Sequence, residues 1–235
     1  TGSTTQGTKP LRAVAKIGQN VTGQMRSDSR ENVTLVATIS ADGRVFDPLV
    51  VFKGRRVQPD WVAQESGPPN ATYVATESLF IEGTVFLDYL KDFHKQLGKL
   101  KLLDGKPHAL LLNDHAAHMT LEAIKLARKL GIVLFQLPSH TPHITQSLDV
   151  TAFGSYKSRV TKALTAFPGN HGGRLPLKRD IVIVIGKAFR ASFSPQQNMA
   201  SFEGTGLWSV DADRALGRLK RTSKRKERPN DREPL

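Results

Sequence analysis

The sequence predicts an α/β protein in which a mixed sheet, with parallel and antiparallel strands, carries helices on both faces. Three patterns support this prediction: an alternating hairpin near the start, a strand–helix–strand unit in the middle, and amphipathic helices after it. The chain has 235 residues, enough to bury a substantial core. We expect one domain over residues 1–216 and a basic, disordered tail over residues 217–235.

A β-hairpin is the first predicted element. Apolar and polar residues alternate over residues 32–40, and residues 45–53 form the returning strand. The intervening residues 41–44 read ADGR, which is typical of a tight turn. Pro48 has no N–H to donate, so it indicates an edge position or a bulge. Residues 54–76 then read as a loop.

A strand–helix–strand unit is predicted in the middle of the chain, after a helix over residues 84–97 that Gly98 ends. The unit begins with an apolar strand over residues 109–112 and closes with another over residues 132–137. Because the connection is short, we expect the two strands to be parallel, with a right-handed crossover.

The helix of that unit has clear end signals. Thr120 can cap its first turn, and Gly131 follows its last residue. Leu121, Ile124 and Ala127 are expected to face the core.

Two more helices are predicted towards the C-terminus. An apolar stripe runs through residues 150–167, and the run Pro168-Gly169-Asn170 is expected to stop that helix. The stripe consists of Phe153, Tyr156, Val160, Leu164 and Phe167. Residues 179–193 combine a β-branched run, which favours a strand, with an amphipathic continuation that favours a helix, and we expect a helix. The order hairpin, strand, helix, strand, helix matches a ribonuclease-H-like layout, and other α/β folds fit the periodicity nearly as well.

Composition points to a polyanionic partner. The formal net charge is +13, and there are no cysteines, which excludes disulfides and thiolate zinc sites. No apolar run approaches the roughly 18 residues that span a bilayer, and no secretory signal opens the chain, so we expect no membrane association.

The C-terminal tail carries much of the positive charge. Residues 214–235 hold nine Lys or Arg against three Asp or Glu. Such a cluster is typical of nuclear targeting or phosphate contact, or else it is a solvated tail. Its central residues are Lys220, Arg221, Lys224, Arg225 and Lys226.

Candidate catalytic residues follow the two strands of the central unit. Asn113 and Asp114 come directly after the first strand, and Asp149 follows the loop after the second. Chemistry in open sheets gathers at the carboxyl ends of parallel strands. Asp114 and Asp149 could there hold Mg²⁺ for phosphodiester cleavage. The alternatives are that Asp149 is a helix N-cap and that Asp114 is an ordinary turn residue.

Four histidines lie in the same two loops. His115 with His118, and His140 with His143, have a spacing that could bind zinc. Because both pairs lie in loops, each ring could instead bond backbone groups or contact phosphate.

Several motifs resemble the DDE superfamily endonuclease domain, in the branch of pogo, Tigger and jerky-like transposases that is related to mariner elements and centromere protein B. The similar segments include residues 31–34 (ENVT), 39–43 (ISADG) and 48–54 (PLVVFKG). Residues 110–118 resemble the second acidic motif of that family through His115 and His118. Residues 137–150, LPSHTPHITQSLDV, resemble the third, with His140, His143 and Gln146.

The resemblance implies a metal-dependent core that cuts and joins DNA, with three acidic residues holding Mg²⁺ or Mn²⁺. Asp149 matches the third acid. Counting back from His118 places Asn113, a neutral amide, at the second. Thr1 and Gly2 match the end of the family's first acidic motif, so the first acid and its central strand would precede residue 1. Ser147 also departs, because the family usually has proline there.

These departures bear on the expected function. A lost unit charge facing a divalent cation is worth several kcal/mol even at an effective dielectric near 20, and about 1.4 kcal/mol is a tenfold change in rate. We therefore expect a nuclear, transposase-derived domain that binds DNA and has impaired endonuclease activity. Lys157, Arg159 and the tail cations are the expected phosphate contacts. The alternatives are an active endonuclease using Asp114 and a non-enzymatic interaction module.

Overall fold

The computed structural model describes residues 33–63, 66–79, 81–113, 118–138, 146–214 and 216–217. They fall into two compact units. The first unit holds the described residues of Thr1–Thr38, Asp47–Glu82 and Tyr156–Ala191. The second holds those of Ile39–Phe46, Gly83–Ser155 and Ser192–Leu235. The predicted strand before residue 1 and the predicted tail beyond residue 217 lie outside the described residues.

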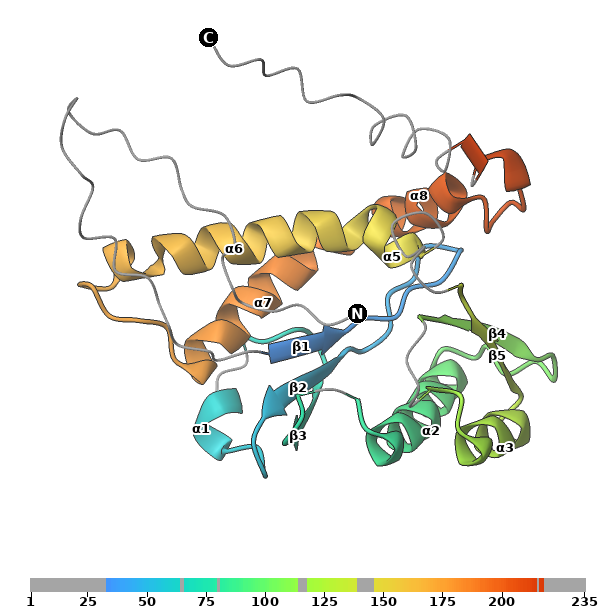
Figure 1. Cartoon of the computed structure of the whole chain (residues 1–235), viewed down its shortest axis with the longest axis horizontal. Coiled ribbons are helices and arrows are strands. Elements are labelled where there is room, and N and C mark those ends of the chain that lie inside the picture. Colours follow the sequence, from blue (N-terminus) through green and yellow to red (C-terminus); the bar gives the residue numbers. More distant parts are fainter. Residues whose placement is uncertain are drawn as a thin grey trace, which may run out of the picture. The chain divides into compact units, whose positions relative to one another are not determined.

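The first unit contains a three-stranded mixed sheet in the order β1–β2–β3 (Figure 1). Its strands are β1 (Val33–Val36), β2 (Leu49–Lys53) and β3 (Thr72–Thr76). β2 pairs antiparallel with β1 and parallel with β3. This central strand is the most apolar of the three, and Val50, Val51 and Phe52 are fully buried.

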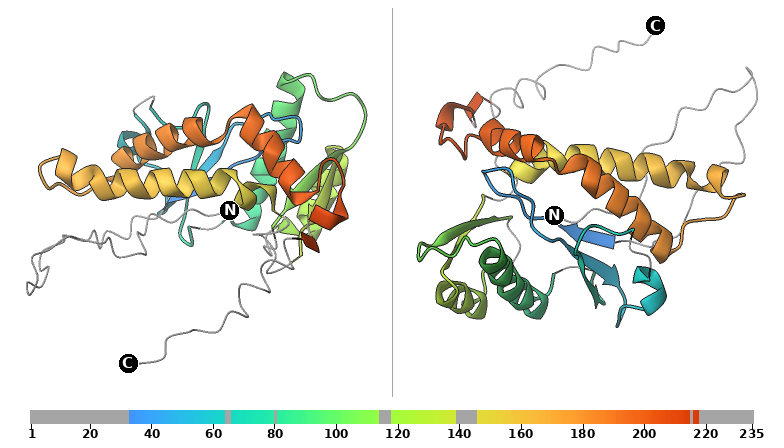
Figure 2. Two further views of the ribbon diagram at one scale, coloured as in Figure 1. Left: turned by 90° about the horizontal axis from the view of Figure 1, so that it is seen from above. Right: turned by 180° about the vertical axis from the view of Figure 1, so that it is seen from behind.

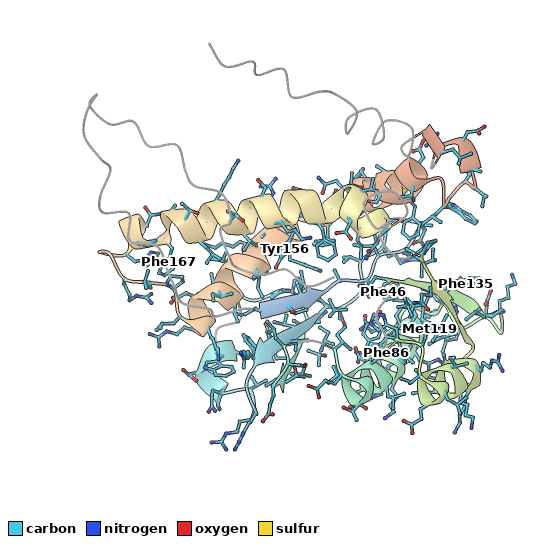
Figure 3. The ribbon with its side chains drawn as sticks, in the orientation of Figure 1. Phe46, Phe86, Met119, Phe135, Tyr156 and Phe167 are labelled. Carbon is cyan, nitrogen blue, oxygen red and sulfur yellow. The ribbon has the colours of Figure 1, made fainter. Side chains whose placement is uncertain are left out.

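Two helices complete the core of the first unit, and a short one precedes β3. They are α1 (Pro59–Val62), α6 (Ala152–Asn170) and α7 (Lys178–Ser192). α6 and α7 lie side by side, and Tyr156 lies between them (Figures 2 and 3). The stripe predicted on α6 is confirmed, since Tyr156, Val160 and Phe167 are buried. On α7, Ile181, Val182 and Ile185 form the equivalent buried face.

The second unit contains the strand–helix–strand pattern. Its elements are α2 (Gly83–Lys99), β4 (His108–Leu112), α3 (Leu121–Lys129), β5 (Ile132–Gln136), α5 (Ser147–Val150) and α8 (Pro195–Thr205). β4 and β5 are parallel, as predicted. Phe46, Phe86 and Met119 gather between α2 and these strands (Figure 3).

Several predicted features are confirmed in detail. The turn at residues 41–44 closes with the Gly43 amide 3.0 Å from the Ser40 carbonyl oxygen, and Ile39 bridges to Val45. Thr120 caps α3 by accepting from the Ala123 amide at 3.2 Å. Residues 178–192 are helical, so amphipathicity outweighs the β-branched run. The predicted α/β class with both strand directions is confirmed, although the described strands form two sheets.

Other predictions about element ends are wrong, or right only in part. Gly98 does not end α2, which continues to Lys99. Pro168 itself lies within the last turn of α6, where a proline removes only one backbone donor, and the helix ends at Asn170, the last residue of the predicted stop. For Pro48 the edge alternative is wrong, since it precedes central strand β2. The bulge alternative is supported, because two residues separate Val36 from Ile39 whereas three separate their partners Leu49 and Val45.

Two predictions about burial and loops are also wrong. Leu121 is 66% exposed, because the cap at Thr120 places it on the first, outward turn of α3. Residues 54–76 are not all loop, since they include α1 and β3.

Candidate functional site

The parallel strands β4 and β5 end at the same edge of their sheet. Leu112 pairs with Gln136, and the amide of Leu137 donates to the Leu112 carbonyl at 2.8 Å. Asn113 follows β4 directly and is half-buried. Its side chain therefore stands at a strand end, the position where the sequence predicted the second acidic residue of the site.

His118 contacts the backbone of Asn113. Its side chain is buried, and Nδ1 lies 3.4 Å from the Asn113 carbonyl oxygen. The ring also packs on Phe86, with 4.6 Å between the ring centroids. A ring held on both sides in this way contributes to packing and to backbone geometry.

Asp149 lies in the short helix α5 and is half-buried. Gln146 is the N-cap residue of α5, and its carbonyl accepts from the Asp149 amide at 3.1 Å. Asp149 is therefore not the N-cap of this helix. The backbone of α5 instead sets the position of its carboxylate.

Two hydroxyl pairs fasten α5 to α8. Ser147 Oγ lies 3.4 Å from Thr205 Oγ1, and Thr151 Oγ1 contacts Ser201 Oγ. Ser201 and Thr205 are four residues apart on one face of α8, whereas Ser147 is the first residue of α5 and Thr151 is the C-cap residue after its last. Ser147, Ser201 and Thr205 are buried. We call these four residues the hydroxyl ladder.

The direction of the ladder bonds follows from the other contacts of α8. Thr205 Oγ1 donates to the Phe202 carbonyl at 2.9 Å, and Ser201 Oγ donates to the Gln197 carbonyl at 2.7 Å. A hydroxyl has one proton, so Ser147 and Thr151 must donate across the ladder. The hydroxyl of Ser147, where the family usually has proline, is thereby used to anchor the helix that carries Asp149.

Close packing ends α8 just after the ladder. Gly206 has φ of 71°, and a Cβ added there would lie 2.0 Å from the Asp211 carbonyl oxygen. The Asp211 amide donates to the Gly206 carbonyl at 2.8 Å. Only glycine adopts this positive φ readily and leaves room for the Asp211 carbonyl, so Gly206 fixes the end of α8 directly after Thr205.

The described part of the predicted ligand set does not fit a two-metal centre. It consists of the Asp149 carboxylate and the neutral Asn113 amide. Within the described residues, no group of three or more His, Asp or Glu side chains could hold a metal ion. Asp114, His115, His140 and His143 lie outside the described residues.

Predicted phosphate-contacting residues are placed in part. Lys157 and Arg159 are exposed on α6. The tail cations Lys220, Arg221, Lys224, Arg225 and Lys226 lie outside the described residues.

Sequence reasoning missed Ser201 and Thr205 as positioning groups, because neither is a catalytic residue type. The four-residue spacing of small hydroxyl side chains was the available signal.

Comparison with known proteins gives the following relatives. The chain is 26% identical over 199 residues to "MFS-type transporter clz9" of Cochliobolus lunatus, which covers 83% of this chain and 21% of that protein. It thus spans about a fifth of that relative's length. None of the described helices is long and apolar enough to cross a membrane.

The chain is also similar in structure to the "Mos1 transposase paired-end complex with left transposon end". The TM-score is 0.45 at 9% sequence identity, over 84% of this chain and 51% of that chain. Residues 29–168, more than half of the chain, match the family described as DDE superfamily endonuclease, and the chain therefore belongs to that family.

Proposed function

We propose that this chain is a DNA-binding domain of transposase descent, from the pogo, Tigger and jerky-like branch, that acts in the nucleus with its endonuclease activity impaired. Membership of the DDE superfamily endonuclease family is the first reason to propose DNA as the partner. The distribution of charge on the first unit supplies the argument from this chain.

An acid-free run of sequence carries the proposal. Between Asp149 and Asp180 there is no Asp or Glu, while the same residues hold six Lys or Arg. These cations are Lys157, Arg159, Lys162, Arg174, Lys178 and Arg179. The first three are exposed on α6, a helix with no acidic side chain along its whole length.

α6 therefore has no negatively charged side chains that could pair with its own Lys and Arg residues. Exposed helices usually alternate charges, because pairs three and four residues apart stabilise them. α6 contains cations only, and these three suit the phosphates of a duplex backbone. Contacts of this kind hold DNA without reading its bases, and each releases counterions on binding.

Impairment of catalysis follows from Asn113. An amide oxygen carries no net charge, whereas a carboxylate would attract Mg²⁺ or Mn²⁺ by several kcal/mol more at an effective dielectric near 20. Should a divalent cation bind, Asp149 would be its ligand in the described region, and the cation would polarise a phosphodiester and its attacking water. A single carboxylate is a weak holder for a divalent cation.

The binding proposal is tested by fluorescence anisotropy with a labelled DNA duplex at several salt concentrations. We expect log K to fall linearly with log salt. The variant Lys157→Gln/Arg159→Gln/Lys162→Gln should bind more weakly, and its slope should be smaller by about 0.9 for each phosphate that it no longer neutralises.

The matched control removes three cations from α3, as Lys125→Gln/Arg128→Gln/Lys129→Gln. It has the same net charge as the α6 variant and should keep the wild-type slope. Absence of binding by the wild-type chain, or equal loss in both variants, would contradict the proposal.

A further inference from the structure

A second group of basic residues surrounds an aromatic ring on the first unit. It consists of Lys53, Arg55, Arg56, Trp61, Lys178 and Arg179, which we call the Trp61 patch. We propose that this patch is a separate binding surface for the phosphodiester backbone of DNA. The inference rests on the proposed DNA-binding function and assigns it a second contact surface, distinct from α6.

Direct contacts join members of the patch that are distant in sequence. Lys178 Nζ lies 3.9 Å from the centroid of the Trp61 ring and donates to the Lys53 carbonyl at 3.2 Å. Trp61 in turn packs on Phe52, with 5.2 Å between ring centroids. β2, α1 and the start of α7 therefore meet at this point, as Figure 1 also shows for α1 and β2.

The acidic residues near the patch do not neutralise it. Arg55 pairs with Glu77 at 3.4 Å, but both side chains are highly exposed, at 91% and 76%, so the pair is weak. Asp180 is engaged elsewhere, since Arg174 donates to both of its carboxylate oxygens, at 2.7 and 3.0 Å. Arg56 is exposed and forms no ion pair with any residue that the structure describes. The patch therefore has five cations against the carboxylates of Asp60, Glu77 and Asp180, and Asp180 is shared with Arg174.

The placement of two cations costs helix stability. Lys178 and Arg179 are the first two residues of α7, where the macrodipole disfavours positive charge. Exposed Arg179 gains no described packing in return. Lys178 offsets this cost through its contacts with Trp61 and Lys53, and Arg179 offsets it in part through its attraction to Asp180.

The kind of ligand follows from the spacing of the charges. The cations come from the end of β2, the residues just after it and the start of α7, and Lys178 is held over the Trp61 ring. Charges from separate segments suit a run of phosphates better than one small anion. Guanidinium groups bind phosphate oxygens through two donors, and the patch offers three of them. Lys178 is held over Trp61, so a phosphate that approaches its ammonium group changes the surroundings of that ring.

Trp61 provides a local reporter of binding. The chain has two tryptophans, Trp61 and Trp208. In Trp208→Phe, emission comes from Trp61 alone, and we expect a saturable change when a DNA duplex is added. In the matched protein Trp61→Phe, emission comes from Trp208 in the second unit and should not change.

A charge variant tests the patch independently of the fluorescence. Arg55→Gln/Arg56→Gln/Arg179→Gln should lower the salt slope of duplex binding by about 0.9 for each phosphate left without its cation. The control Lys125→Gln/Arg128→Gln/Lys129→Gln should not. Circular dichroism of each variant checks that it is folded.

The outcomes separate the two proposals. If the wild-type chain binds no duplex, the proposed function itself fails. If it binds and the α6 variant has a smaller slope while the patch variant does not, only the Trp61 patch is refuted. A Trp61 response to poly-glutamate but not to DNA would also overturn the patch, because it would show a surface for acidic peptides.

Discussion

At the scale of single residues, the neutral amide of Asn113 matters most. It follows the last residue of β4. A carboxylate at this position could hold Mg²⁺ or Mn²⁺. We predict that Asn113→Asp raises Mn²⁺ affinity by about tenfold or more, since one added charge is worth several kcal/mol at close range. Isothermal titration calorimetry measures this. Asn170→Asp, at the exposed end of α6, is the control and should leave affinity unchanged.

A second residue-scale prediction concerns Asp180 and pH. Hydrogen bonds from Arg174, opposed by partial burial and helped by the Leu177 amide, hold the pKa of Asp180 below its usual range. A lowered pKa in the folded state gives stability that is present at neutral pH and lost as pH falls below about 4, through the lowered pKa.

Asp180→Asn should therefore lower the Tm by about 1–2 °C at pH 7, a small effect because Arg174 is exposed. The difference between wild type and variant should shrink as pH approaches 3. A difference that is constant with pH would show that the carboxylate charge is not its source.

At the scale of elements, the hydroxyl ladder decides how α5 is held. Thr205→Val keeps the shape of the side chain but removes the acceptor of Ser147. We expect a loss of about 1–2 kcal/mol in the free energy of unfolding, because a buried donor is left without its partner. Thr165→Val, on the exposed side of α6, is the control and should cost much less. Urea unfolding compares the two, and equal losses would contradict the ladder.

Replacing glycine by alanine should have opposite effects on stability at Gly186 in α7 and at Gly154 in α6. A Cβ on Gly186 would lie 2.2 Å from the Ser66 carbonyl oxygen, whereas a Cβ on Gly154 in α6 meets nothing within 4 Å. Gly186→Ala should cost about 2 kcal/mol or more, because backbone must move. Gly154→Ala should add up to about 1 kcal/mol through helix propensity. Thermal unfolding of both variants checks the signs.

Elements with apolar periodicity were predictable from the sequence. Tyr156, Val160 and Phe167 repeat at helical spacing, and all three are buried. α8 was missed because Asn198, Ser201 and Thr205, which it buries, are polar and leave no hydrophobic period. β3 was missed because it is short and its burial comes from parallel pairing with β2, a contact distant in sequence.

At the scale of the whole molecule, the family resemblance is confirmed by the match over residues 29–168. The strand end before Asn113 was also predictable, since β4 and the apolar run both end at Leu112. The ladder partners were not, because the two pairs join residues 58 and 50 positions apart in sequence. The roles of Asp149, Asn113 and Asp114 stay predictions.

The central claim is that the molecule holds DNA through its cations and does not cut it. One agarose gel tests both parts: supercoiled plasmid with wild-type chain or Asp149→Asn, in Mg²⁺ and in Mn²⁺, run with and without protein removal. We predict that both proteins retard the plasmid equally and leave it supercoiled once removed. Nicking by the wild-type chain that Asp149→Asn abolishes, or no retardation by either protein, would contradict the account.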